Sequence, residues 1–233
     1  MEALKITFKL ATPFVSNGYP IHLDSILGHA YVRHYLPDSP EKNEDELFAI
    51  LEDLPIEKHQ QEDDWVYKCS ALIPVGDKSH STRFFTRRYP EMEIAKATVK
   101  GDIKNGNFKK EEGLERHKMK LDIGRGPQKK VLSYYPLTGC DELVAYCIGE
   151  KELIEEALTE WGYITHLGGM RRMGNGFISG VTIEVDESAL ENWKKRATPW
   201  KLSDESVNIS CTTKNPYWDK TKMINGYCHM SLF

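Results

Sequence analysis

The stretch "GYITHLGGMRRMGNGFISG" (residues 162–180) contains six glycines and two adjacent arginines, and it runs directly into an apolar segment. Glycine tolerates positive φ and allows another backbone to approach closely. Exposed N–H groups and the guanidinium groups of Arg171 and Arg172 can bind phosphate oxygens. A plain connection between a helix and a strand would also explain the glycines. The paired arginines favour the alternative, a loop that binds an anion.

The flanking segments predict where this loop lies in the fold. Apolar residues in 151–161 recur on one helical face, and "FISGVTIEV" (177–185) has the composition of a strand. A Walker loop would need a lysine and a hydroxyl after its last glycine, and a dinucleotide fingerprint would need a strand before its loop and a helix after it. "GRGPQKK" (124–130) fails the fingerprint too, because Lys129 stands where the third glycine should be. Both common phosphate motifs are therefore excluded.

The rest of the chain predicts an α+β fold. Residues 4–10 alternate between apolar and polar, and residues 23–34 have helical spacing, with Asp24 or Ser25 as the N-cap and Pro37 beyond the end. Two more strands are expected at 65–76 and 142–150. The resulting order, β-α-β followed by β-α-β, is that of a ferredoxin-like or RNA-recognition-motif-like palm.

A long basic segment interrupts this plan. About 65 residues separate the second and third predicted strands, far more than a hairpin loop needs. Residues 78–130 hold 15 Lys and Arg against 7 Asp and Glu, whereas the whole chain has a net charge of −4. We predict a palm with a C-terminal extension (1–77 and 131–233) and a thumb-like basic insertion (78–130). Residues 38–64 are acidic, and we expect a solvated excursion there with one short helix.

The basic insertion has the composition of a single-strand-binding surface. "STRFFTRRYPEMEIAK" (81–96) alternates arginines with aromatic rings, so that guanidinium groups can meet phosphates while rings stack on unpaired bases. Neighbouring residues on a strand face opposite sides, so we expect one of Phe84 and Phe85 to be buried. A solvated loop of mixed charge is the alternative.

Other classes of site lack their motifs. The five cysteines contain no C-x-x-C, so we expect neither a disulfide framework nor a zinc site, and no cofactor. A serine hydrolase would need a G-x-S-x-G elbow, which is missing. No stretch approaches the roughly 20 apolar residues of a membrane span. We expect a cytoplasmic protein that does not bind membranes.

The glycine loop also carries a family resemblance. Its form L-G-G-x-R-R-x-G-x-G, between the last helix and the last strand, resembles the signature of the CRISPR-associated RAMP superfamily, whose RNA-recognition-like domains bind crRNA. "PIHLDSILGHA" (20–30) and "NPYWDK" (215–220) narrow the resemblance to the Cas-five-type subunit of type IV CRISPR effector complexes. The resemblance covers residues 4 to about 220, but it does not extend to 38–64 or 78–130.

This resemblance implies a non-catalytic subunit that holds the 5′ handle of the crRNA and contacts neighbouring effector subunits, with target DNA as a further candidate partner. The residues expected to bind RNA, from the loop, the first helix and the insertion, are Gly168, Gly169, Arg171, Arg172, Gly174, Asn175, Gly176, His22, Arg83, Phe85, Arg87, Arg88, Lys109, Lys110, Arg125, Lys129 and Lys130.

Two other functions remain open at this point. Some RAMP relatives cleave RNA by metal-independent acid–base chemistry, for which His22 and His29 are candidates if they are exposed. No partner base can be assigned to either histidine from the sequence. The third hypothesis is a protein-only adaptor or inhibitor that joins an effector complex without binding RNA.

Overall fold

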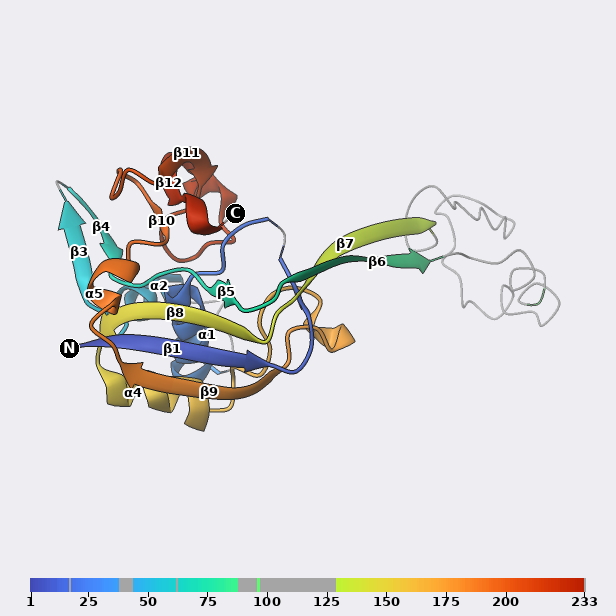
Figure 1. The fold of residues 1–233 in the computed structure, drawn as a ribbon, viewed down its shortest axis with the longest axis horizontal. Helices are drawn as coiled ribbons and strands as arrows, with labels where there is room; N and C mark the ends of the chain where they lie inside the picture. Colours follow the sequence, from blue (N-terminus) through green and yellow to red (C-terminus); the bar gives the residue numbers. More distant parts are fainter. Residues whose placement is uncertain (17, 38–43, 62, 88–95, 97–128, 233) are drawn as a thin grey trace, which may run out of the picture. The chain divides into compact units, whose positions relative to one another are not determined.

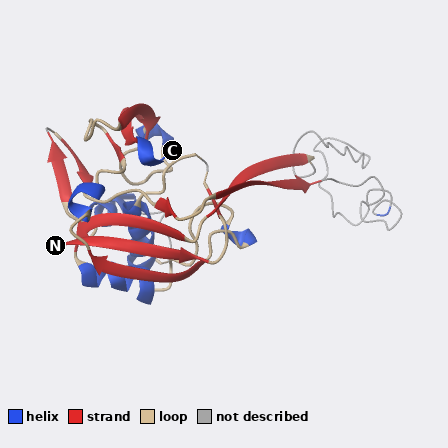
Figure 2. Cartoon of the chain, viewed as in Figure 1, coloured by secondary structure: helices blue, strands red, loops and turns tan. Residues whose placement is uncertain are grey.

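The computed structural model describes residues 1–16, 18–37, 44–61, 63–87, 96 and 129–232, which form a mixed α/β fold with mostly antiparallel sheets (Figures 1 and 2). The chain divides into two compact units, one formed by Met1–Ser81 with Pro136–Phe233 and the other by Thr82–Tyr135.

A four-stranded sheet is the centre of the first unit. Its order is β5 (Ile73–Val75), β8 (Glu142–Gly149), β1 (Glu2–Leu10), β9 (Ile178–Val185), and all neighbours are antiparallel. The alternation in β1 produces one buried face, because the side chains of Leu4, Ile6 and Phe8 are fully buried. The strands predicted at 4–10, 142–150 and 177–185 are confirmed.

Two helices cover one face of this sheet (Figure 1). They are α1 (Leu23–Tyr35) and α4 (Lys151–Glu155), and α4 continues as the π-helix η2 (Glu156–Glu160). Their apolar side chains form one hydrophobic core with β1 and β8. Both helices were predicted, but the N-cap of α1 was not: it is His22, which makes no side-chain capping bond, and Asp24 lies buried in the first turn.

The prediction of one strand at 65–76 is wrong, because this segment contains two separate strands, β4 (Asp64–Tyr67) and β5. Between them the backbone N–H groups pair with different segments, since Ala71 donates to Lys195 O and Leu72 to Ile21 O. β4 pairs instead with β3 (Lys58–Gln61).

The acidic excursion contains the predicted short helix, α2 (Glu44–Glu52). It also contains β3, which the sequence did not predict. The excursion is not wholly solvated, because Leu51, Leu54 and Ile56 are buried.

The remaining elements complete the description. A second sheet has the order β10 (Ala197–Thr198), β12 (Ile224–His229), β11 (Ser206–Cys211), and a third has the order β2 (Phe14–Val15), β7 (Val131–Gly139), β6 (Ser79–Arg87). The short helices are α5 (Ala189–Asn192), η3 (Arg171–Met173), η4 (Lys220–Lys222) and η5 (Met230–Leu232). Four cysteines are buried, and Cys140 is half-buried. Among the helices in the described ranges, none is long and apolar enough to cross a membrane.

Candidate nucleic-acid interface

The glycine loop before β9 is a tight structure with several residues in the left-handed region. Gly168, Gly174 and Gly176 have φ of 78°, 79° and 69°, and Met170 has φ of 55°. Side chains are disfavoured in this region, which explains why glycine recurs here. Between the left-handed residues Met170 and Gly174, Arg171–Met173 form the 3₁₀-helix η3. Both arginines are exposed.

The loop is fixed to the chain segment that follows β1. The hydrogen bonds that make this connection include Gly169 N to Val15 O (2.9 Å), Gly176 N to Pro13 O (2.8 Å) and Thr12 Oγ1 to Gly174 O (2.8 Å). Because hydrogen bonds hold the backbone on both sides of η3, the backbone positions of Arg171 and Arg172 are fixed before any ligand binds. Groups positioned in advance lose less entropy when a ligand binds.

The glycines of the loop differ in what a side chain would meet at each position. A side chain at Gly168 would meet Val15 O at 2.5 Å, and one at Gly176 would overlap Leu167 O. Gly176 was expected to bind RNA, but protein backbone fills the space beside it. Gly174 has open space beside it, so only its positive φ requires glycine.

Asn175 is a buried residue of the glycine loop. Its side chain is buried, and its Nδ2 donates a hydrogen bond to Met170 O (3.2 Å). This bond spans η3 and stabilises the left-handed residue before it. Asn175 therefore supports the conformation of the loop.

Gly174→Val is expected to lower the free energy of unfolding by about 1 to 3 kcal/mol, because a β-branched residue is strained at positive φ. Gly180→Val is the matched control, since Gly180 in β9 also has open space and does not have positive φ. Urea denaturation of both variants tests this. Equal stability of the two variants would contradict a conformational role for Gly174.

A further cation and a histidine lie near the loop. Burial lowers the pKa of His29, and the positive charges of Arg171 and Arg33 lower it further. The charges of Arg33 on α1 and of Arg171 in the glycine loop therefore both act on His29. Among the described residues, Arg33, Arg171 and Arg172 form no ion pair with a carboxylate. Arg33 was not among the residues expected to bind RNA, although its i, i+4 spacing from His29 places both side chains on one face of the helix.

His22 is not available to RNA in the way that was expected. Its residue exposure is 3%, its ring stacks on Tyr217 with a centroid distance of 4.4 Å, and its Nε2 accepts a hydrogen bond from Ala197 N (3.0 Å). Burial and the charge of Arg196 lower its pKa to about 3. The imidazole is therefore neutral near pH 7, and it is a poor general acid.

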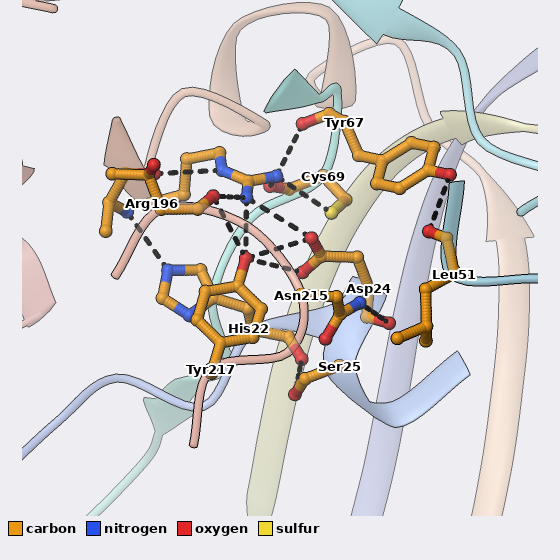
Figure 3. Close-up of polar contacts among 11 residues, drawn as sticks. His22, Asp24, Ser25, Leu51, Tyr67, Cys69, Arg196, Asn215 and Tyr217 are labelled. Carbon is orange, nitrogen blue, oxygen red and sulfur yellow. Dashed lines mark hydrogen bonds and ion pairs between the residues drawn. The ribbon is translucent and has the colours of Figure 1, made fainter. Parts of the chain in front are cut away.

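A buried ion pair lies beside His22 (Figure 3). The Arg196 guanidinium approaches Asp24 Oδ2 at 3.3 Å and donates to Thr213 O at 2.9 Å, and both charged side chains are almost fully buried. The Tyr217 hydroxyl donates to the Asp24 carboxylate at 2.9 Å. Burial opposes the charge of Arg196, yet Tyr217 and Asp24 raise its pKa overall. The network joins the C-terminal extension to the start of α1.

The second unit exposes both cations and rings. Arg83, Phe85 and Arg87 in β6 are exposed, as are Lys129 and Lys130 before β7. The expectation that one phenylalanine is buried is wrong, because Phe84 and Phe85 are 66% and 42% exposed, respectively. Both rings of this pair are therefore available on the described surface of β6.

Four of the residues expected to bind RNA are not among the residues that the structure describes. Arg88, Lys109, Lys110 and Arg125 lie outside the described residues. Within the described ranges, no three His, Cys, Asp or Glu side chains gather in a way that could hold a metal ion.

Comparisons with known proteins place these features in a family context. The family model described as CRISPR type IV associated protein Csf3 matches residues 2–229. A search of curated proteins gives no match. Among solved structures, the chain is similar to one in the crystal structure of the Csm3-Csm4 subcomplex in the type III-A CRISPR-Cas interference complex. The identity is 13%, the match covers 99% of this chain and 91% of that chain, and the TM-score is 0.38.

Proposed function

This chain belongs to the CRISPR type IV associated protein Csf3 family, and from this premise we propose that it is a non-catalytic crRNA-binding subunit of a CRISPR effector ribonucleoprotein. In this proposal it holds the repeat-derived 5′ handle of the crRNA and contacts neighbouring effector subunits. The family match confirms the sequence-based prediction of a type IV CRISPR-associated protein.

The observation that carries the proposal is the pair of exposed arginines on η3. Arg171 and Arg172 have no carboxylate partner among the described residues, and the backbone on both sides of them is hydrogen-bonded to residues 12–15. Guanidinium groups form strong, charge-assisted hydrogen bonds with phosphate oxygens. Arg33 on α1 adds a third positive charge to this surface. These features support binding of a phosphodiester backbone.

The sheet order supports a ferredoxin-like palm as the finer fold assignment. In the order β5-β8-β1-β9 the first and third strands of the β-α-β-β-α-β plan lie in the middle, and α1 and α4 share one face. The second unit is then a thumb-like insertion. Its exposed cations and rings support contact with single-stranded RNA, because rings stack on unpaired bases.

The geometry gives less support to an endoribonuclease. His22 is buried and neutral, and the pKa of His29 is lowered by burial and by Arg171 and Arg33. A histidine with a lowered pKa could act as a base, but Arg171 beside it is more readily explained by phosphate binding. The adaptor hypothesis does not explain why these exposed arginines form no ion pair within the described part of the chain.

Incubation of the purified protein with labelled repeat RNA separates the three functions. We expect the RNA to be retained intact. Cleavage in the presence of EDTA would support the endoribonuclease, and a failure to retain RNA would support the adaptor. Repeat RNA of scrambled sequence is the control for non-specific retention.

RNA affinity is expected to fall steeply with salt concentration, because each phosphate contact releases counterions. For single strands the slope of log affinity against log salt is about −0.7 per contact, so four contacts would give roughly −3. Filter binding between 50 and 300 mM salt measures this slope. A nearly flat plot would contradict an electrostatic interface.

A further inference from the structure

A cavity of the first unit lies beside the buried network of Arg196 and Asp24. It has a volume of about 430 Å³, and its lining includes His22, Tyr217, Tyr19, Trp218 and Lys220. The side chains of Tyr19 and Trp218 are 60% and 78% exposed, respectively. A volume of this size is within the range of small-molecule sites. The cavity thus combines two accessible rings, a cation and a buried histidine.

The histidine offers this cavity an unused hydrogen-bond donor. Because Nε2 of His22 accepts from Ala197 N and the ring is neutral, the proton lies on Nδ1. Nδ1 is buried and has no partner with hydrogen-bond geometry among the described residues. The nearby Pro20 carbonyl raises the pKa slightly without meeting that geometry. A buried donor of this kind is unfavourable unless a partner such as a ligand or an ordered water satisfies it.

Trp218 is well placed to bind a planar ligand. The residue before it, Tyr217, is anchored because its hydroxyl donates to the Asp24 carboxylate (Figure 3). Trp218 also borders a neighbouring cavity of about 260 Å³, which is lined by His29 as well. The positive charge of Arg171 helps to lower the pKa of His29. Trp218 and His29 thus border the same cavity.

We propose that the cavity beside His22 binds one unpaired nucleobase of a single-stranded nucleic acid. In this site the base stacks on Trp218, an acceptor on its edge receives the His22 Nδ1–H bond, and Lys220 contacts the adjoining phosphate. Every base presents an acceptor on its edges, so the site selects an unpaired base rather than a sequence. The inference rests on the proposed RNA-binding function and adds a subsite to it.

The test uses single-stranded oligoadenylate containing one 2-aminopurine, as RNA and as DNA of the same length. Stacking on Trp218 is expected to quench the emission of the 2-aminopurine. Trp218→Ala should weaken binding about 5- to 160-fold, the usual range for loss of one stacking ring, and should restore emission. Trp218→Phe should retain most of both effects. Tyr35→Ala is the control, because Tyr35 is also exposed and lines neither cavity.

The outcomes separate this subsite from the proposed function. Quenching with both probes, or with either one alone, supports a base site and identifies the nucleic acid that fills it. If the wild-type protein binds RNA and Trp218→Ala changes neither affinity nor emission, the subsite is wrong and the proposed function stands. If Trp218→Ala weakens only the association with other effector subunits, Trp218 is a protein contact and the inference is overturned. If the wild-type protein binds neither probe nor repeat RNA, the proposed function fails as well.

Discussion

Arg171→Ala/Arg172→Ala is expected to weaken binding of repeat RNA by about 2 to 4 kcal/mol, roughly 30- to 1,000-fold, because each charged hydrogen bond contributes about 1.5 to 3 kcal/mol. The fold should survive, since both side chains are exposed and the backbone of the loop holds its shape. Isothermal titration or filter binding measures the loss, and circular dichroism checks the fold.

A matched control separates specific contacts from a general loss of charge. Lys9→Ala/Lys201→Ala removes the same amount of positive charge from two exposed positions outside the loop. This control should weaken RNA binding less than threefold if the contacts at η3 are direct. Equal losses in the two double variants would mean that only net charge matters, and unchanged affinity in a folded Arg171/Arg172 variant would contradict the interface.

Arg196→Met is expected to lower the free energy of unfolding by about 3 to 5 kcal/mol, because it leaves the Asp24 carboxylate buried without its cation. It also removes the hydrogen bond to Thr213 O, which holds the C-terminal extension. Urea denaturation followed by tryptophan fluorescence measures the change.

The Arg196→Met/Asp24→Asn double variant tests the reason for this loss. Removing the second charge should recover part of the stability, because a buried pair is costly mainly when only one partner is deleted. If the double variant is less stable than Arg196→Met by the full additional cost of a single Asp24→Asn change, the two residues are not coupled and the account of the network is wrong.

The elements that could be predicted from the sequence are those with a local periodic signal. The alternation in β1 and the helical spacing of α1 each place apolar side chains on the buried face, and both patterns are confirmed. The glycine-rich loop was predicted to permit positive φ, and Gly168, Gly174 and Gly176 have it. Exposure of Arg171 and Arg172 also followed from their place in a loop.

The features that were not predicted depend on contacts between distant segments. His22 has a polar side chain at the start of a helix, which locally indicates exposure, but Ala197 and Tyr217 cover it. Arg196 stands in a lysine-rich stretch that resembles a solvated face, but it is fully buried. The strand expected at 65–76 fails for the same reason, since its backbone bonds go to several distant partners.

Photo-crosslinking of repeat RNA containing 4-thiouridine, followed by mass spectrometry of the RNA-linked peptides, tests the central proposal most directly. If the glycine loop binds the RNA backbone, crosslinks should concentrate in the peptides that contain residues 163–177, and Arg171→Ala/Arg172→Ala should remove them. A wild-type protein that crosslinks to RNA only through other peptides, with none from this loop, would contradict the account.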